Sequence, residues 1–473
     1  MVEQGWYLAM LVLALFAWID WRRAILLAVV ADALRDPVRK LIETEPVGVT
    51  VSVAGLWLVL TAIAVVKSQT EFTLLFRRYP KIRTMLTCIV IALIPAALMS
   101  CVLYAGGYKL AIVGVVSYVA PVFGIGVGYL FARSEREIYR LFAVYVAVNS
   151  LLLVGTPLEF LGYDLPGLGG LKDFEWIRYR RGYTVDLISG FYRSPDIMGL
   201  HAAHVVMFAT TLSVRSNSAS RAGWGVLVLW AALSLMLCGR RKMIAIPLVF
   251  IAAFVLIGAA RGIRQLNALI GLTIAILFGG LAVTLSLLDE TDAGEYAEYA
   301  ASTFVEGADR FEATVVNSSI GTLRQVGVLG AGVGTATQGR YYVNVSTSRE
   351  ARGWQEDGVS RVFVEFGIPG AILLAAAALS FVLALRNAIR VVPPDSPVQL
   401  LQITTLSVLV ANAASFVISH QQFSGDPVSA LWATMMAGMC LGAPRIFAMR
   451  ARAMASRGAT VRPPQPAAAG RTR

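Results

Sequence analysis

Three consecutive cations, Arg240, Arg241 and Lys242, follow a glycine in a short turn between two apolar runs. The runs, at about 223–238 and 242–259, are short for membrane spans, and short spans draw their connecting turn toward the bilayer. Two interpretations of the cations are open. They snorkel to lipid phosphates and anchor the hairpin, or they bind the pyrophosphate of a lipid-linked substrate, which suits the planar donor fork of guanidinium.

A second basic side chain precedes another apolar run. The string GFYRSPDIMG places Arg193 directly before a run that starts near Ile197. Pro195 suits the start of a helix there, and Asp196 falls in its first turn. Alone, Arg193 is an ordinary interfacial arginine. Two arginine sites at helix mouths on one side of a membrane exceed what that interpretation predicts.

The composition of the chain is that of a membrane protein. Hydrophobic residues make up 57% and charged residues 15% of 473 residues, which is too little charge to cover a soluble globule. Apolar runs of roughly 20 residues without strand alternation predict helices and exclude a barrel, because backbone groups in lipid must be satisfied internally. We therefore predict an all-α polytopic membrane protein, and the net charge of +12 does not indicate a nucleic-acid partner.

Eleven apolar runs are long enough for firm membrane helices. They lie at about 46–66, 84–104, 110–131, 139–160, 197–214, 223–238, 242–259, 266–287, 359–385, 399–419 and 427–444. The first 45 residues cross once or twice more, for a total of about 12–13 helices. We expect a transmembrane domain over 1–444 and a disordered basic cytoplasmic tail over 445–473.

Lysine and arginine in the short loops predict the orientation. The positive-inside rule places the basic tail in the cytoplasm, and five more loops with basic residues fall on the same side. These loops hold Arg386 and Arg390, Arg261 and Arg264, Arg215 and Arg221, Arg133 to Arg140, and Lys67 to Arg83. The periplasmic face then receives loop 161–193, the Arg240 turn, segment 288–358 and the turn after His420. Eleven carboxylates against five arginines in 289–357 suit an outward-facing segment.

Four motifs occur in the order seen in one known family. The strings FYRSPDIMG, GRRK, VGVLGAGVG (326–334) and EDGVSRVFVEFGIPG (356–370) resemble the O-antigen polymerase and O-antigen ligase superfamily of bacterial envelope polysaccharide assembly. The resemblance covers roughly residues 190–385. In the ligases the last motif begins with a histidine and an Asn-like residue. Here Glu356 and Asp357 stand at those places, which favours a polymerase or a divergent member over a ligase.

The resemblance implies an inverting glycosyl transfer at the periplasmic face of the bacterial inner membrane. An undecaprenyl-diphosphate-linked glycan would donate to an acceptor sugar, without a metal or another cofactor. Arg193 and Arg240 match the family's arginine positions and would hold the leaving diphosphate, supported by Arg241 and Lys242. Glu356 is expected to orient or deprotonate the acceptor hydroxyl. Membrane lipid and a polysaccharide chain-length regulator are further expected partners.

Other polar residues near the last motif have structural alternatives. Asp357 is a further candidate for substrate binding, and Arg361, one turn into the next helix, could bind phosphate or Glu356. His420 is the reserve candidate for the base. Glu365 is predicted to pair with Arg361 at i, i+4 spacing. Elsewhere, His201 and His204 (i, i+3) would form either a metal pair or, as we expect, hydrogen bonds in the core.

A second class of function, a polytopic transporter or a flippase for lipid-linked glycan, also fits this number of spans. A transporter should bury charges at mid-membrane or break helices in matched halves. Here the notable charges gather at one face, beside the largest extramembrane segment. That distribution favours an enzyme.

Overall fold

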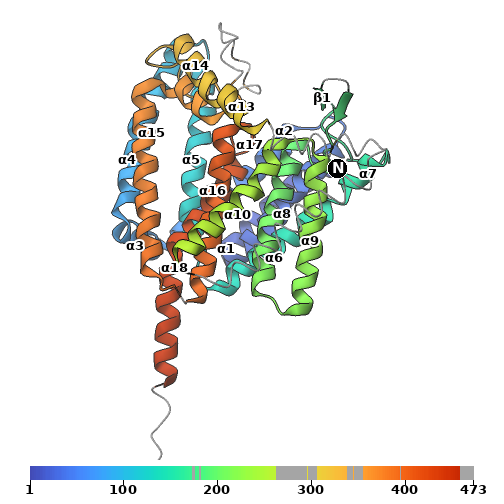
Figure 1. The fold of residues 1–473 in the computed structure, drawn as a ribbon. Helices are drawn as coiled ribbons and strands as arrows, with labels where there is room; N and C mark the ends of the chain where they lie inside the picture. Colours follow the sequence, from blue (N-terminus) through green and yellow to red (C-terminus); the bar gives the residue numbers. More distant parts are fainter. Residues whose placement is uncertain are drawn as a thin grey trace, which may run out of the picture.

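The chain forms a layer of long helices packed side by side (Figure 1). This computed structural model describes residues 1–172, 176–180, 183–262, 296, 306–337, 343, 345, 355–394 and 396–458. Ten of the described helices are long and apolar enough to cross a membrane. The protein is therefore an all-α, multi-pass membrane protein. Each of the ten coincides with a predicted run, and the eleventh run, 266–287, lies outside the described residues.

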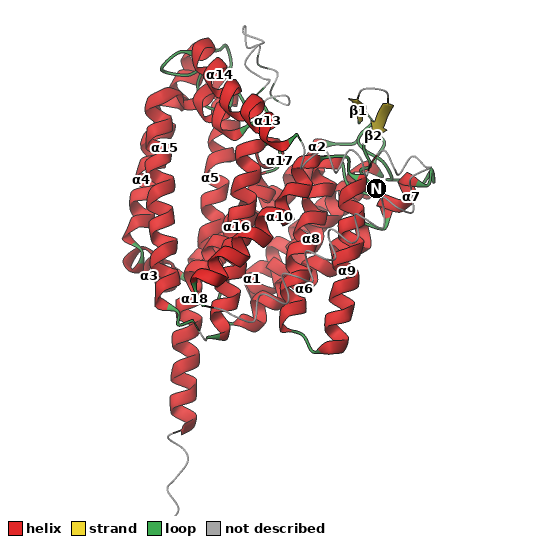
Figure 2. Cartoon of the chain, in the orientation of Figure 1, coloured by secondary structure: helices red, strands yellow, loops and turns green. Residues whose placement is uncertain are grey.

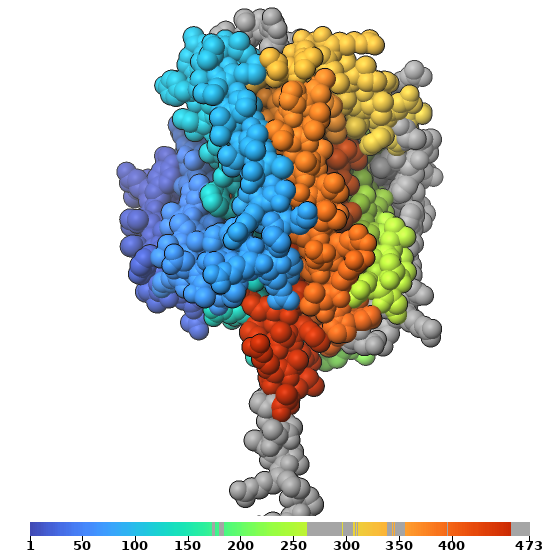
Figure 3. Space-filling model, turned by 90° about the vertical axis from the view of Figure 1, so that its left-hand side faces the viewer, coloured from blue at the N-terminus to red at the C-terminus, as the bar shows by residue number. Residues whose placement is uncertain are grey.

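The ten helices follow the chain with short connections. They are α2 (Val47–Lys67), α4 (Pro80–Leu103), α5 (Gly107–Phe131), α6 (Glu135–Leu152), α8 (Pro195–Arg215), α9 (Ser218–Leu237), α10 (Arg241–Ala260), α15 (Gly358–Val391), α16 (Pro397–Ile418) and α18 (Pro427–Gly458). On one face α4 and α15 run side by side (Figure 3).

The short elements divide the molecule into two unlike ends (Figure 2). One end carries α7 (Gly155–Phe160), β1 (Ile177–Arg180), β2 (Tyr183–Asp186), α13 (Gly307–Phe311), a π-helical turn η1 (Glu312–Asn317), α14 (Ser318–Val326) and α17 (Gln421–Ser424). We call it the loop-rich end. The strands pair antiparallel, with Ile177 opposite Asp186. The opposite end, which we call the tail end, carries α3 (Gln69–Arg78) and the last turns of α18.

The first helix, α1 (Val2–Lys40), traverses the layer twice because it breaks at Asp20 (φ −140°, ψ 86°). Trp6 donates to Ser52 near the start of α2, at the loop-rich end. Arg22 donates to the last carbonyls of α5, at the tail end. Lys40 returns to backbone carbonyls in the segment before α8. The N-terminal residues therefore make two passes of the layer.

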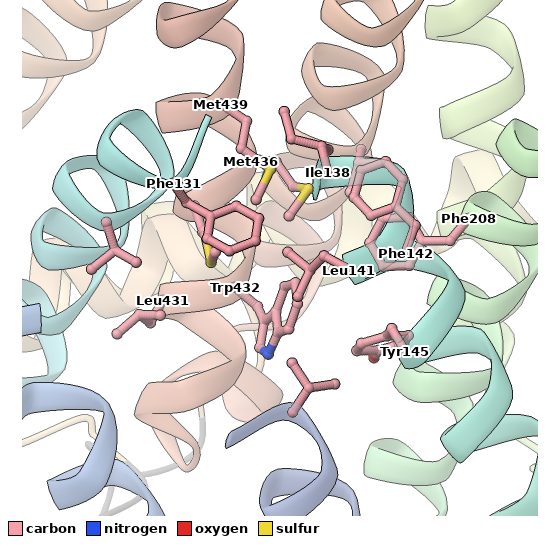
Figure 4. Packing of buried hydrophobic residues seen from close by; sticks show 14 of the residues in the cluster. Phe131, Ile138, Leu141, Phe142, Tyr145, Phe208, Leu431, Trp432, Met436 and Met439 are labelled. Atoms are coloured by element: carbon pink, nitrogen blue, oxygen red, sulfur yellow. The ribbon is translucent and has the colours of Figure 1, made fainter. Parts of the chain in front are cut away.

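Helix α8 is the most enclosed of the ten, with 94% of its most apolar stretch buried. Phe208 stacks on Phe142 of α6, with ring centroids 4.4 Å apart (Figure 4). The Tyr145 hydroxyl lies 2.7 Å from His201 Nδ1. His204 Nδ1 lies 2.8 Å from the carbonyl of Leu200 one turn earlier. The two histidines therefore form hydrogen bonds in the core, as expected from the sequence.

The glycine-rich segment 327–334 is a tight irregular turn. Its four glycines all have positive φ, at 72°, 77°, 96° and 90°. A Cβ atom on Gly334 would lie 2.1 Å from the carbonyl oxygen of Leu110 in α5. Ala331 N donates to Val364 O of α15 at 2.6 Å. Because the backbone approaches its neighbours this closely, the segment packs directly between α5 and α15.

Helix α18 continues to Gly458, beyond the domain boundary expected at residue 444. Ala, Met and Arg after Pro444 are strong helix formers, which explains the extension. Arg445 and Arg450 also pair with Glu71 and Glu135. The disordered tail expected over 445–473 therefore begins no earlier than 459, and residues 459–473 lie outside the described part of the chain.

Candidate functional site

Two cations contact one carboxylate at the loop-rich end, and a third acts on it electrostatically. Asp196 lies in the first turn of α8, as its sequence predicts. Arg240 Nη2 and Lys242 Nζ lie 3.2 and 2.9 Å from its two oxygens. Arg178, on β1, also acts electrostatically on Asp196. We call these four residues the Asp196 cluster, and their charges leave an excess of two positive charges.

The turn between α9 and α10 positions two of these cations. Gly239 has φ +58°, a left-handed conformation that lets the chain reverse within a few residues. Arg240 is then the N-cap of α10, and its side chain caps none of the helix's first amides. A helix N-terminus carries partial positive charge and favours an anion. The turn therefore adds a helix dipole to the excess charge of the Asp196 cluster.

The Asp196 cluster has hydrogen-bonding capacity that the described residues leave unfilled. The Nε atoms of Arg178 and Arg240 are buried and donate to no described group. The Arg240 guanidinium lies 5.9 Å from the ring centroid of Trp176, which holds it against an aromatic face. Only 12% of the Arg240 side chain is exposed. An anion that entered here would meet charged donors in a largely dehydrated setting.

Arg241, the middle cation of the turn, points to a different partner. Its Nη1 lies 2.6 Å from Glu306 Oε2, next to α13. The Glu306 side chain is 44% exposed. Arg241 therefore ties the turn to the segment that precedes α13, while its neighbours on both sides contact Asp196.

Arg193 belongs to a separate group of charges. It donates to Asp36 at 3.2 Å and to Asp426 at 2.9 Å. Arg35 contacts Asp426 as well and lies 2.9 Å from Asp32. We call these five residues the buried ion network; Arg193 is 11% exposed and the others are almost fully buried. Three carboxylates against two arginines give the network a net negative charge.

Asp426 is the carboxylate that both arginines of the buried ion network share. Burial would raise its pKa, but Arg35 and Arg193 lower it below its ordinary value. Its Oδ1 also accepts from the Val428 amide at the start of α18. Asp426 thereby fixes the start of α18 to α1 and to the segment before α8.

The connection between α16 and α18 joins the Asp196 cluster, the buried ion network and Glu356. Ser419 Oγ accepts from Lys242 Nζ at 2.8 Å. The His420 amide donates to the Glu356 carbonyl at 2.9 Å. Asp426, at the other end of the connection, binds Arg193. Residues 419–426 thus link three positions that are far apart in the sequence. They bind the Arg193 side chain, the Glu356 carbonyl, and Lys242, which contacts the same carboxylate as Arg240.

His420 and Glu356 have opposite surroundings. His420 is buried, with Nε2 2.9 Å from the Gln355 carbonyl and Nδ1 2.8 Å from Ser424 Oγ. Because a carbonyl only accepts, Nε2 is assigned the proton and Nδ1 accepts from the hydroxyl. Burial, with Arg361 and Lys242 as further causes, lowers the pKa of His420 to about 3. Glu356 is exposed, and its carboxylate meets no donor among the described residues.

Asp357 and Arg361 have partners within the protein. Asp357 is the N-cap of α15, and its Oδ1 accepts from the Ser360 amide at 2.6 Å. Burial raises the pKa of Asp357. Arg361 Nε lies 3.3 Å from Glu365 Oε2, which confirms the predicted i, i+4 pair, and its Nη2 donates to Thr337. These contacts fasten the start of α15 and the segment that follows the glycine turn.

Sequence reasoning missed Arg178, Asp36 and Asp426. Arg178 lies in a polar loop whose hairpin no strong turn signal marks. Asp36 follows Arg35 and lies four residues after Asp32, at the end of a short apolar run, and Asp426 stands in the string GDP directly before the last span. Asp32 and Arg35 at i, i+3 in this N-terminal stretch were a signal, because charged residues near membrane spans are costly unless they are paired. No comparable signal marked Asp426 or Arg178.

Comparisons of the chain with known protein families and with curated proteins returned no match. Within the described residues, no group of three or more His, Cys, Asp and Glu side chains could hold a metal ion. The chemistry available at the described site is that of cations gathered around a helix start, which suits an anionic group.

Proposed function

We propose that the protein transfers glycan from an undecaprenyl-diphosphate carrier to an acceptor sugar at the loop-rich end, and thereby polymerises envelope polysaccharide. The observation that carries the proposal is the Asp196 cluster, where Arg240 and Lys242 contact one carboxylate at the starts of α8 and α10 and Arg178 acts on it electrostatically. A diphosphate leaving group needs such charge because negative charge develops on it during transfer.

In the proposed reaction, the acceptor hydroxyl oxygen attacks the anomeric carbon from the side opposite the diphosphate. A new carbon–oxygen bond forms, and the bond to the phosphate oxygen breaks. The bonding electrons leave with the lipid diphosphate, whose charge Arg240, Lys242 and Arg178 would offset. The hydroxyl proton goes to a base, and inversion at the anomeric carbon follows from this single displacement.

Glu356 is the better candidate for the base by its surroundings. Its carboxylate is exposed and meets no donor among the described residues. Both ring nitrogens of His420 already have partners, and a pKa of about 3 keeps the ring neutral at physiological pH. His420 would therefore support Glu356 through its amide contact with the Glu356 carbonyl.

Arg193 has a different role in this proposal. Its two terminal nitrogens bind Asp36 and Asp426, within a network of net negative charge. It would therefore act as a positioning residue that fixes the start of α8, and hence Asp196. Arg193→Ala should abolish elongation and also lower the melting temperature, whereas Arg240→Ala should abolish elongation alone.

The decisive experiment complements a strain that lacks the gene with Arg240→Ala and measures polysaccharide length. We expect elongation to be lost while the protein accumulates in the membrane. Arg221→Ala is the matched control, because Arg221 is exposed at the tail end and donates to the backbone carbonyl of Ser216. Polymer of normal length in the Arg240→Ala strain would refute the proposal.

The gene deletion itself distinguishes polymerase from ligase. A missing polymerase leaves single repeat units on the lipid carrier, and a missing ligase leaves long lipid-linked polymer. Glu356→Gln then tests the proposed base. Full elongation activity in this variant would assign deprotonation of the acceptor hydroxyl to another group.

A transporter or flippase is a second candidate, because two observations favour it. Helix α1 breaks at Asp20, and α15 breaks at Gly367 (φ 63°). The buried ion network also places charges inside the helical layer. Purified protein in vesicles separates the two functions, since a flippase moves lipid-linked glycan between leaflets without lengthening it.

A further inference from the structure

The glycine turn, residues 327–334, reaches into the helical layer beside α4. The Val333 amide donates to the Ala96 carbonyl at 3.0 Å, and the Val333 carbonyl accepts from the Ser100 hydroxyl at 2.6 Å. Ala96 lies seven residues before the end of α4 at Leu103, which is about 10 Å along the helix axis. Because α4 is apolar enough to cross a membrane, Val333 lies alongside the membrane-spanning part of that helix.

The contact between the turn and α15 lies at a matching depth. The Ile368 amide donates to the Val328 carbonyl at 2.8 Å, directly after the break of α15 at Gly367. Ile368 precedes the exposed Arg386 by 18 residues, or about 27 Å of helix, and the hydrocarbon core of a bilayer is about 30 Å thick. A bilayer whose tail-end surface lies at Arg386 therefore reaches Ile368 and Val328.

Irregular backbone at this depth needs partners within the protein, because lipid supplies no hydrogen bonds. The Gly334 and Ala336 amides both donate to Glu365 Oε1 at 3.1 Å. The Ala331 amide donates to the Val364 carbonyl at 2.6 Å. Residues 331–337 are all buried. The segment therefore meets the condition under which non-helical backbone is found inside a membrane.

The same contacts explain an ion pair buried on a membrane helix. Glu365 and Arg361 have side chains no more than 2% exposed, and such charges are costly inside a membrane without partners. Arg361 Nη2 donates to Ser117 of α5 and to Thr337, and the Thr337 hydroxyl lies 2.8 Å from Glu365 Oε1. The pair thus binds the segment after the turn and joins it to α5 and α15.

The turn carries two apolar side chains on the outside of the molecule. Val328 is 60% and Leu329 is 63% exposed. Ile368, which binds the Val328 carbonyl, is 38% exposed, and Ile372 one turn further along α15 is 64% exposed. We call Val328 and Leu329 the tip. It continues an apolar surface of α15, a helix that runs beside α4 across the layer (Figure 3).

We propose that residues 327–337 form a re-entrant membrane segment whose tip contacts the acyl chains of the leaflet at the loop-rich end. The segment follows α14 and precedes the start of α15, and both lie at that end (Figure 1). Acyl chains fit the tip because it is apolar and continuous with exposed side chains of a helix long enough to cross the bilayer. The Arg361–Glu365 pair holds the segment from inside the protein. This membrane contact is independent of the proposed glycan transfer.

The test places a nitroxide spin label on Leu329→Cys in the full-length protein, reconstituted in phosphatidylcholine vesicles. The four native cysteines are first replaced by alanine; they are Cys88, Cys101, Cys238 and Cys440. Collisions with oxygen, which concentrates in hydrocarbon, are compared with collisions with a water-soluble nickel chelate. We expect the label at position 329 to meet oxygen in preference to the nickel chelate.

Two further labelled positions calibrate the measurement. Ile372→Cys is the control for lipid contact, because Ile372 is exposed on the spanning part of α15. Asp309→Cys is the control for water, because Asp309 is an exposed carboxylate on α13 at the loop-rich end. The ratio of oxygen to nickel collisions at position 329 should match the ratio at 372 and exceed the ratio at 309.

A substitution inside the protein tests the role of the ion pair. Glu365→Gln removes the charge that two amides share, so the label at position 329 should collide more often with the nickel chelate. Glu312→Gln neutralises an exposed carboxylate on η1 and should leave the collisions unchanged.

Three results would overturn the proposal. A ratio at position 329 equal to that at 309 would place the tip in water. A label that neither reagent reaches would mean that protein, such as a second copy of this chain, covers the tip. An unchanged ratio in Glu365→Gln would show that the ion pair does not hold the segment in the membrane.

Discussion

Arg178 tests whether the excess charge around Asp196 has a function. It reaches the Asp196 cluster from β1, and its buried Nε donates to no described group. Under the proposed function, Arg178→Ala should slow elongation by about tenfold or more, because one of the charges that would offset the leaving diphosphate is lost. The rate is measured with purified protein and lipid-linked repeat units.

The control for Arg178 is its lysine variant. Arg178→Lys keeps the positive charge and should retain more activity than Arg178→Ala, and both should melt at the temperature of the unaltered protein. Equal activity of the alanine variant and the unaltered protein would remove Arg178 from the site.

The stability of the protein should fall on acidification partly through His420. Its pKa is about 3 in the fold and roughly 6.5 in an unfolded chain. The unfolded state therefore binds more protons between these values, so stability is full above about pH 6.5 and is lost as the pH falls toward 3. The loss attributable to His420 is at most about 1.4 kcal/mol per pH unit.

Thermal melting of the unaltered protein and of His420→Asn, between pH 7 and pH 4.5, measures this effect. The variant should lose less stability across that range than the unaltered protein does. Parallel losses would mean that His420 does not titrate with unfolding.

At the scale of single residues, the sequence singled out Arg193 and Arg240 but did not predict what they contact. Arg193 and Arg240 were found from charge next to apolar runs, and the N-cap Asp357 lies where its motif begins. The ion pairs depend on long-range packing, which local patterns do not encode. Arg35 and Asp426, for example, are 391 positions apart.

At the scale of elements, the glycine turn leaves little room for side chains. Gly334 has φ +90°, and a Cβ atom there would lie 2.1 Å from the Leu110 carbonyl. Gly334→Ala should therefore destabilise the protein by about 2 kcal/mol or more, from backbone strain and displacement of α5. Thermal melting of the purified protein measures the loss.

Gly321 provides the matched control for the turn. It lies within α14, and a Cβ atom there meets nothing within 4 Å. Gly321→Ala should be neutral or stabilising by up to about 1 kcal/mol, since alanine favours a helix. Similar destabilisation by both substitutions would show that the close approach to α5 does not limit stability.

The membrane-spanning helices were well predicted, because a helix that crosses a bilayer needs a long apolar run. Ten of the predicted apolar runs are helices in the structure. The sequence left open whether the first 45 residues cross once or twice, and the break of α1 at Asp20 gives two passes. Asp20 and the charged residues that follow it turn the chain at the tail end, where Asp20 Oδ1 accepts from the Arg22 and Arg23 amides. The two passes are joined by only a few residues, without a polar loop of ordinary length. The apolar pattern alone therefore does not distinguish one pass from two.

The buried ion network connects the start, middle and end of the chain, so its charge balance concerns the whole molecule. Arg35→Met leaves three buried carboxylates with a single arginine, and should cost about 3–5 kcal/mol. The double variant Arg35→Met, Asp426→Asn restores the net charge of the original network and should recover part of the loss. A double-mutant cycle of melting temperatures measures the coupling.

Strict additivity of the two substitutions would contradict this account of the network. Asp426→Asn alone provides the fourth corner of the cycle. It breaks the contacts that both arginines share but leaves equal numbers of buried carboxylates and arginines, so it should cost less than Arg35→Met.

For the whole molecule, the all-α multi-pass architecture followed from composition. An apolar cavity of about 680 Å³ between α2, α3, α4 and α5 did not, because its wall uses the same residue types as any packed helix interface.

The position of Asp426 has a consequence for how the protein is made. During translation Arg35 is synthesised first and Arg193 much later. Asp426, the carboxylate that both arginines contact, is synthesised only shortly before α18. A ribosome that stops short of residue 426 releases a polypeptide whose two arginines lack their shared anchor.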